Sequence, residues 1–463
     1  MRGSGWALTW LWLLAIQPFL AQTEEETLPK DTGYRGIWYM NQPTQDEHRY
    51  KYSGGFATYP QQHVPIAVYS KAASKTFFCY GGTPKGKAGE LLHMVSYYDH
   101  ATGTVPRPTI LLNKHTEDAH DNPTLALDAA GHVWVFSNSH GTSRPSFIHR
   151  SRKPYDVGAF ELVSKTNFSY GQPWFMAERG FVFLHTLYQP GRKLFWMTSP
   201  DGREWSPAQP LSAIGQGHYQ VSWPCGTRLA TAFDFHPEKG GLNARTNLYY
   251  LETADGGRTW RTADGVAVTT PLAEIRNPAL VHDYQAEKKL VYLKDLNFDA
   301  EGRPVVFFLT GSGYAPGPRN GPRVLQTARW TGKEWEIRPL TEVDHNYDHG
   351  SLYIEADDAW RVIAPTEPGP QPHATGGDVC VWVSPDQGRT WNRIRQLTEK
   401  SRFNHTYVRR PLNAHPDFYA FWADGNPLAP SESRLYFTNR NGDHVWRLPP
   451  EMDGENAKPE VAW

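Results

Sequence analysis

Apolar residues along this chain gather in short runs that are broken every few residues by turn-forming residues. Examples are the runs at 193–197 (Lys-Leu-Phe-Trp-Met) and 247–251 (Asn-Leu-Tyr-Tyr-Leu). Aromatic-rich runs of this length are typical of β-strands, and long stretches with the 3.6-residue period of a helix are hard to find. The content of 40 Gly, 37 Pro, 18 Trp and 23 Tyr agrees with short strands joined by tight turns. The pattern therefore predicts an all-β fold.

A turn phrase of Asp and Gly closed by Trp recurs along the chain. It occurs at 199–205, 253–260 and 384–391, with weaker copies at 128–134 and 330–335. In such a turn Asp caps the backbone, Gly takes a positive φ and Trp covers the hairpin. Strand-like runs flank each phrase, and we interpret them as the outer strands of a four-stranded blade. Successive phrases lie about 55–75 residues apart, which predicts a seven-bladed β-propeller of four-stranded antiparallel blades, with six or eight blades as alternatives.

The amino terminus has the order of a secretory signal peptide. Arg2 precedes an apolar run at 6–20, and small residues at 20–22 precede three glutamates. This run is too short for a comfortable membrane span, and no later segment reaches eighteen apolar residues. We therefore expect residues 1–22 to be removed, residues 23–463 to form a single catalytic propeller domain, and the mature protein to be secreted or periplasmic.

Overall charge and cysteine content exclude several classes of protein. The net charge of −1 gives no global field that would recruit nucleic acid or a membrane surface, so local Arg and Lys groups must meet any acidic ligand. Three scattered cysteines do not make a disulfide scaffold. The core must therefore supply the stability.

Two histidines are predicted to face one space at the end of a blade. His120 precedes a strand at 124–127, and a second strand at 133–136 returns toward His140. A hairpin with arms of near-equal length places both imidazoles at the same end, where they can exchange protons near neutral pH. The alternative is that each histidine is an ordinary polar group at a strand end.

Tyr188 and Arg192 are expected at the corresponding place in the next blade. An arginine can neutralise the carboxylate of a uronic acid so that its C5 becomes acidic, and a tyrosine can carry a proton to the leaving oxygen. Arg245 and Tyr249 are further candidates for contact with substrate. The alternative for Tyr188 is that it only packs a turn.

A structural zinc site is a separate hypothesis. Cys225, His236 and His218 would meet across adjacent strands at tetrahedral ligand distances. The sequence supplies no fourth ligand and matches no strong metal motif, and the alternative is that these three are ordinary strand and loop residues. The predicted chemistry itself requires no cofactor.

The chain resembles the BNR-repeat (Asp-box) propellers that include ulvan lyases and a family of single-histidine α-L-rhamnosidases. The phrases that carry this resemblance lie at 33–38, 76–82, 93–100 and 240–247. For the lyases, the resemblance implies two histidines, a tyrosine and an arginine on one face, which match His120, His140, Tyr188 and either Arg192 or Arg203. For the rhamnosidases, it implies a histidine on the opposite face, which matches His63 beside Gln62.

Both families act on L-rhamnose joined α-1,4 to D-glucuronate, so the resemblance implies an acidic polysaccharide as the partner. Our first hypothesis is a polysaccharide lyase acting by β-elimination. The second is an α-L-rhamnosidase that uses His63, with Gln62 orienting sugar or water. The third is a glycan-binding propeller without catalysis. The two carboxylates of an ordinary glycosidase are not evident in the sequence.

Overall fold

The computed structural model describes Met1 and residues 27–55, 63–87, 89–355 and 358–463. Almost all regular structure in this part of the chain is β-strand, which confirms the all-β prediction. The described exceptions are three short 3-10 turns: η1 (Ala119–Asp121), η2 (Gly241–Ala244) and η3 (Pro318–Asn320). The predicted signal peptide falls outside these residues apart from Met1, and its removal stays a prediction.

Four sheets have four strands each, and in every one the strands follow chain order as an antiparallel meander. The first contains β3 (Ala67–Ser70), β4 (Lys75–Gly82), β5 (Leu92–Asp99) and β7 (Thr109–Asn113). The second contains β8 (Pro123–Leu127), β9 (Val133–Ser137), β10 (Ser146–Ser151) and β11 (Phe160–Thr166). The third contains β12 (Ser169–Met176), β13 (Gly180–Tyr188), β14 (Arg192–Ser199) and β15 (Gln209–Ser212). Another contains β22 (Leu290–Phe298), β23 (Pro304–Gly311), β24 (Arg323–Trp330) and β25 (Trp335–Val343).

Two larger sheets complete the body. The six-stranded sheet contains β16 (Gln220–Cys225), β17 (Arg228–Phe235), β18 (Thr246–Thr253), β19 (Trp260–Arg261), β20 (Ala267–Val268) and β21 (Leu280–His282). The nine-stranded sheet contains β26 (Ser351–Ile354), β27 (Trp360–Pro368), β28 (Gly377–Ser384), β29 (Asn392–Gln396), β30 (Asn404–Arg409), β31 (Ala420–Gly425), β32 (Leu435–Thr438), β33 (Val445–Arg447) and β35 (Glu460–Val461). Gly377 and His405 form the only pairing between β28 and β30, so this sheet consists of two meanders joined at one point.

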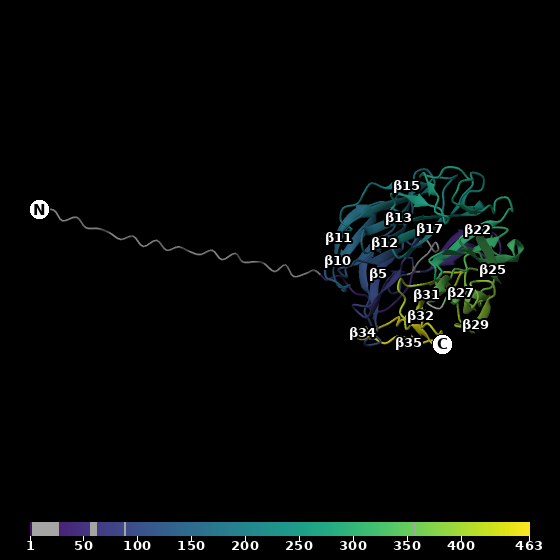
Figure 1. Cartoon of the computed structure of the whole chain (residues 1–463). Helices are drawn as coiled ribbons and strands as arrows, with labels where there is room; N and C mark the ends of the chain where they lie inside the picture. The colour runs from purple at the N-terminus through teal and green to yellow at the C-terminus, as the bar shows by residue number, and fades with distance from the viewer. Residues whose placement is uncertain (2–26, 56–62, 88, 356–357) are drawn as a thin grey trace.

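The sheets follow one another around the molecule in a propeller-like arrangement. In Figure 1 the chain passes around the body from blue through teal and green to yellow. The first strands of neighbouring sheets contact each other, as β8 does with β12 and β22 with β26. Four-stranded antiparallel units are thus confirmed, while the count of seven blades stays a prediction.

The first and last parts of the β-sheet body meet, because the segment that contains Tyr34 and Gly36 packs on the last strands. Tyr34 donates its backbone N–H to the Pro449 carbonyl at 2.9 Å, and Gly36 donates to Ser433 at 3.0 Å. The short strands β6 (Val105–Pro106) and β34 (Asn456–Ala457) pair with each other. A second two-stranded pair, β1 (Tyr39–Pro43) and β2 (Tyr50–Gly54), carries residues toward the centre. The first and last sheets are therefore joined by backbone hydrogen bonds.

The Asp-Gly-Trp phrases at 199–205, 253–260, 330–335 and 384–391 form the turns between the third and fourth strands of their sheets, as predicted. The weak copy at 128–134 instead joins β8 and β9, the first two strands of its sheet. At 199–205, Asp201 Oδ1 accepts the Arg203 N–H at 2.8 Å and Trp205 Nε1 donates to the Gly202 carbonyl at 2.8 Å. Gly257 takes a φ of 90°, and a Cβ placed on it would lie 2.1 Å from Trp196 Nε1. Glycine is required there both by conformation and by space. These turns are structural.

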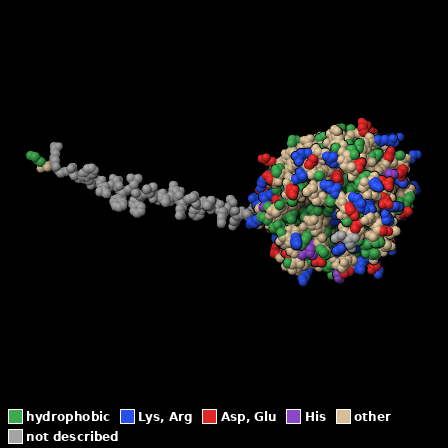
Figure 2. Space-filling model, in the orientation of Figure 1, with side chains coloured by type: hydrophobic (Ala, Val, Ile, Leu, Met, Phe, Trp, Pro, Cys, Tyr) green, Lys and Arg blue, Asp and Glu red, His purple; other side chains and the backbone are tan. Residues whose placement is uncertain are grey.

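Charge on the surface agrees with the near-zero net charge. On the face shown in Figure 2, basic and acidic side chains are interspersed. Within the described residues, no helix has the length and apolar character needed to cross a membrane.

Candidate functional site

A carboxylate bridge joins the two predicted catalytic histidines. Asp118 caps η1, and its Oδ1 accepts the backbone N–H of His120 at 3.0 Å and lies 2.5 Å from His120 Nδ1. Its Oδ2 lies 2.8 Å from His140 Nδ1. The two imidazole rings stack with centroids 4.1 Å apart. The hairpin argument is confirmed in this respect, because β8 and β9 pair with Pro123 opposite Ser137 and bring both histidines to one end.

This bridge sets the tautomer of both rings. A carboxylate only accepts hydrogen bonds, so each neutral imidazole places its proton on Nδ1 and leaves a lone pair on Nε2. Burial, and then the neighbouring His140, lower the pKa of His120, which keeps this imidazole neutral. Burial alone would raise the pKa of Asp118, but its contacts with His120 and His140 outweigh burial and lower it. The carboxylate of Asp118 is therefore ionised, and it faces the neutral imidazole of His120.

The two histidines differ in what their outer nitrogens meet. His120 is buried, and its Nε2 lies 2.7 Å from Tyr52 Oη. The His140 side chain is 27% exposed, and its ring lies 6.0 Å from that of Tyr188. His140 therefore presents its Nε2 lone pair where a substrate can reach it, while His120 lies behind it.

Asp121 and Arg144 hold His140 in place. The buried Asp121 accepts the backbone N–H of His140 at 2.7 Å and the Arg144 Nε–H at 2.8 Å. Arg144 also donates to Asp118 Oδ2 at 3.3 Å. Charge-assisted bonds of this kind fix the geometry of the bridge.

Tyr188 and Arg192 face the histidine pair from the next sheet. They stand opposite each other at the β13–β14 hairpin, and Arg192 Nε donates to Tyr188 Oη at 3.2 Å. Burial raises the pKa of Tyr188, against the opposite effect of Arg192. The phenol thus keeps its proton at neutral pH while its oxygen accepts from a guanidinium.

Further cations gather beside Arg192. The guanidinium of Arg245 lies 4.9 Å from the ring of Tyr219 and that of Arg192 lies 5.9 Å from the same ring. Lys51 is buried and donates to Asn243. Burial first, and then Arg245 and Arg192, lower the pKa of Lys51 to about 6, so Lys51 is mostly uncharged at neutral pH and the two arginines carry the positive charge. Positive charges this close to one another favour an anionic ligand.

The carboxyl group of Asp234 lies next to these cations, and its pKa is raised. Burial raises the pKa of Asp234 to about 7, although Arg245 acts in the opposite direction. Asp234 therefore compensates the cation group only in part near neutral pH, and the remaining positive charge is available to an acidic substrate.

Of the other predicted residues, His63 lies next to His120, whereas Tyr249 lies in the core of its own sheet. His63 is fully buried, with its Nε2 3.0 Å from the His120 carbonyl and its ring 5.7 Å from that of Tyr170; Gln62 lies outside the described residues. Tyr249 donates to the Ile275 carbonyl at 2.8 Å and stacks on Phe233, so it belongs to the core of its sheet.

The two candidate arginines lie in different parts of the structure. Arg203 lies on a rim turn, where it pairs with Glu161 at 2.5 Å. Its guanidinium is therefore occupied at the outside of the sheet, and Arg192 is the arginine that contacts Tyr188.

The three residues of the zinc hypothesis do not come together. Cys225 pairs with Arg228 at the β16–β17 turn, while His218 and His236 flank the opposite end of this hairpin. Seven residues of extended chain span about 23 Å, so Cys225 is remote from both histidines. His218 also uses both ring nitrogens, for Asp234 O at 2.7 Å and Ile214 N at 3.1 Å. The prediction of adjacent strands was correct. The prediction that the three residues meet was wrong, because Cys225 and the histidines lie at opposite ends of the hairpin.

Several site residues were missed in the sequence. Asp118 lies two positions before His120, and Arg144 lies four positions after His140. Lys51 lies twelve positions before His63. An acid at two residues from His120 is a usable signal, because a short turn brings such a pair into contact. No nearby residue in the sequence indicates a role for Lys51, because its charged neighbours Arg192 and Arg245 are distant in the chain.

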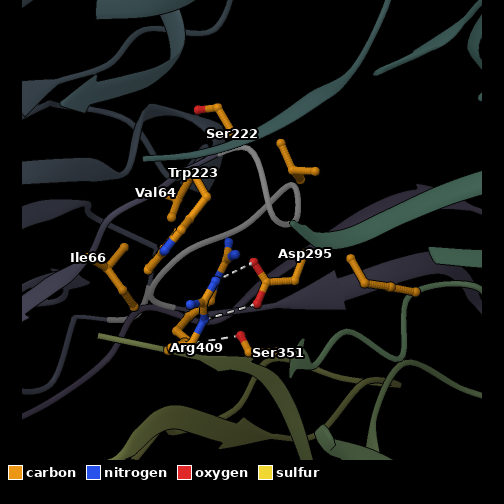
Figure 3. A pocket seen from close by; sticks show the side chains of 10 residues that line it. Val64, Ile66, Ser222, Trp223, Asp295, Ser351 and Arg409 are labelled. Atoms are coloured by element: carbon orange, nitrogen blue, oxygen red, sulfur yellow. Dashed lines mark hydrogen bonds and ion pairs between the residues drawn. The ribbon is translucent and has the colours of Figure 1, made fainter. Parts of the chain in front are cut away.

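A small polar pocket lies among the first strands of other sheets. Figure 3 shows Asp295 and Ser351 facing the arginine side chains at its centre. Arg410 donates to Asp295 through two nitrogens at 3.3 Å and packs 3.6 Å from the Trp223 ring. The cavity of about 10 Å³ has room for roughly one water. Charged side chains thus fill this part of the interior.

Comparison with known proteins identifies the family. Residues 93–343 match the BNR repeat-containing family, so the chain belongs to this family of repeat proteins. It is similar to the ulvan lyase of Nonlabens ulvanivorans, with 23% identity over 339 residues that cover 65% of this chain and 69% of the relative. It is also similar to the ulvan lyase of Alteromonas sp. (strain LOR), with 21% identity over 346 residues, 65% of this chain and 68% of the relative.

Solved structures share the fold. A PL25 polysaccharide lyase described as an ulvan lyase superposes with a TM-score of 0.69 at 16% identity, covering 88% of this chain and 95% of its own. A structure of such a lyase bound to -[GlcA(1-4)Rha3S]- gives a TM-score of 0.69 at 15% identity, with 89% and 96% covered. The polysaccharide lyase Uly1 gives 0.61 at 10% identity, with 90% and 99% covered.

Proposed function

We propose that this protein is a polysaccharide lyase that cleaves L-rhamnose-α-1,4-D-glucuronate linkages of an acidic polysaccharide such as ulvan by β-elimination. The observation that carries the proposal is the Asp118-bridged histidine pair, which lies beside a tyrosine that accepts a hydrogen bond from an arginine. The named relatives are ulvan lyases, which supports this reaction class. None of those relatives is a rhamnosidase, so the hydrolase alternative is not favoured.

His140 is the proposed base. Its Nε2 lone pair removes H5 of the uronate, and Asp118 stabilises the imidazolium that forms. His120 does not touch substrate in this proposal. It shares the same carboxylate and so positions His140.

The cation group is proposed to receive the uronate carboxylate. Arg192 and Arg245 neutralise this carboxylate, so the negative charge that spreads onto it from C5 is stabilised. The C5 electron pair forms a C4–C5 double bond as the C4–O4 bond breaks. Tyr188 then delivers its proton to the departing rhamnose oxygen.

This scheme needs no metal, since arginine charge does what a cation would do at the carboxylate. Activity on ulvan should therefore survive chelation.

We also infer from the sequence at 1–22 that the mature protein acts outside the cytoplasm. Amino-terminal sequencing of exported protein should begin close to residue 23, and a product that keeps the first twenty-two residues would contradict export by cleavage.

The decisive experiment follows products from ulvan. A lyase generates unsaturated uronate ends, which absorb in the ultraviolet as a conjugated enoate, and releases no free rhamnose by hydrolysis. Free rhamnose without new absorbance would refute the proposal and point to the hydrolase. Binding to ulvan without any product would identify a glycan-binding propeller.

A further inference from the structure

A second group of metal-ligating side chains lies where the first and last sheets meet. His100 follows β5 in the first sheet, and His415 and Asp417 lie between β30 and β31. One ligand atom from each residue lies within 4.8 Å of the others. These atoms come from segments more than three hundred residues apart in the chain, so their meeting depends on the packing of the two ends.

The hydrogen bonding of His100 leaves one ring nitrogen able to bind a metal ion. Its Nε2 lies 2.8 Å from Thr76 Oγ1, and its buried Nδ1 has no hydrogen-bond partner among the described residues. When Nε2–H donates to the threonine, Nδ1 carries the lone pair. A hydrogen bond from the outer nitrogen is the usual way in which a protein orients a metal-binding imidazole.

The other two ligands are already spaced for one ion. His415 Nδ1 and Asp417 Oδ2 are 3.7 Å apart. Two ligands of a tetrahedral ion with bonds of about 2.0–2.1 Å are separated by about 3.4 Å. His415 Nδ1 at present accepts the Asp417 backbone N–H at 3.1 Å, and an ion would take over that lone pair. The ligand atom of His100 lies within 4.8 Å of both, so the three side chains must draw together to hold an ion.

The surroundings favour entry and retention of a cation. The two imidazole rings are 3.9 Å apart, and Tyr69 packs 5.2 Å from His100 and 4.8 Å from His415. Asp417 is exposed, with a side-chain exposure of 64%, so an ion can enter from solvent and keep a water. Asp99, next to His100, adds a second negative charge near the ring.

We propose that His100, His415 and Asp417 bind one divalent transition-metal ion of the zinc type, which ties the first sheet to the last. Two imidazoles and a carboxylate form a ligand set that suits Zn²⁺. The ion is structural in this proposal and takes no part in cleavage of a polysaccharide. The group formed by Asp118, His120 and His140 also has metal spacing, but there both Nδ1 atoms already bond to the carboxylate.

The test uses the full protein stripped with EDTA and then titrated with Zn²⁺ against a zinc indicator. We expect one tight equivalent, together with a rise in thermal midpoint of about 3 °C when zinc is 100 times its Kd. Asp417→Asn and His415→Asn should lose both effects. Because Asp417 is exposed, its variant keeps the fold even if the other does not.

Two further variants separate this site from others. His282→Asn removes a histidine that pairs with Glu287 in a different sheet, and His140→Asn removes the other candidate group. Both should bind zinc as the parent does. Zinc uptake that is unchanged in Asp417→Asn, or a thermal midpoint that does not respond to zinc in the parent, would overturn the proposal.

Discussion

Asp118→Asn tests the histidine bridge most directly. The carboxylate faces Nδ1 of His120 and Nδ1 of His140 at once. An asparagine offers one acceptor oxygen and one NH₂ group, so one of the two imidazoles must move its proton to Nε2 and lose the lone pair that acts as base. The substitution also removes two charge-assisted hydrogen bonds, each contributing about 1.5–3 kcal/mol.

If the transition state loses about 3–5 kcal/mol of stabilisation, kcat falls by roughly 10²–10⁴. The assay is the initial rate of new ultraviolet absorbance from ulvan at neutral pH, with substrate affinity measured separately. Asp128→Asn is the matched control, because Asp128 holds Trp134 and His132 in the same sheet but belongs to the β8–β9 turn. A folded Asp118→Asn protein that keeps more than a third of the parental kcat would refute the reasoning.

Three other results are expected. Tyr188→Phe should lower kcat at least about 10²-fold with KM little changed, since only the proton to the leaving oxygen is lost; a variant with the parental rate would remove Tyr188 from the mechanism. Because burial raises the pKa of Tyr188 above its ordinary 10, a pH–rate profile should hold its plateau past pH 9 and fall only above about 10, and an alkaline fall centred at pH 8 would contradict this role. Gly257→Ala should cost about 1–3 kcal/mol, seen as a thermal midpoint lowered by about 1–3 °C, because its Cβ would strike Trp196; Gly265→Ala has a similar φ of 86° and open space, so an equal loss there would show that backbone strain alone is responsible.

The parts of the site that the sequence predicted are those formed within one hairpin. His120 and His140 flank two strands of equal length, and Tyr188 and Arg192 flank one tight turn, so strand periodicity alone brings each pair together. The same reasoning failed for Cys225. It lies on a strand adjacent to the expected partners, but adjacency does not decide which end of a hairpin a residue occupies.

Contacts between different sheets could not be predicted from the local sequence pattern. Lys51 comes from the short β1–β2 pair, yet it donates to Asn243 and lies near Arg192 and Arg245, which are far from it in the chain. No run of neighbouring residues encodes such an approach. The repeat of turn phrases, in contrast, depends on each hairpin alone, which is why the four-stranded units were predictable.

The junction of the chain ends has a consequence for synthesis. Phe78 of the first sheet packs on Phe418 and Phe421 of the last, with ring centroids 5.8 and 5.1 Å apart, and Tyr34 bonds to Pro449. At a translation rate of 5–20 residues per second, the ribosome needs roughly 20–70 s to pass from the end of the first sheet to Pro449. Throughout that interval the aromatic face of the newborn first sheet has no partner. A polypeptide released early, even by a few dozen residues, would consequently be a substrate for chaperones and proteases.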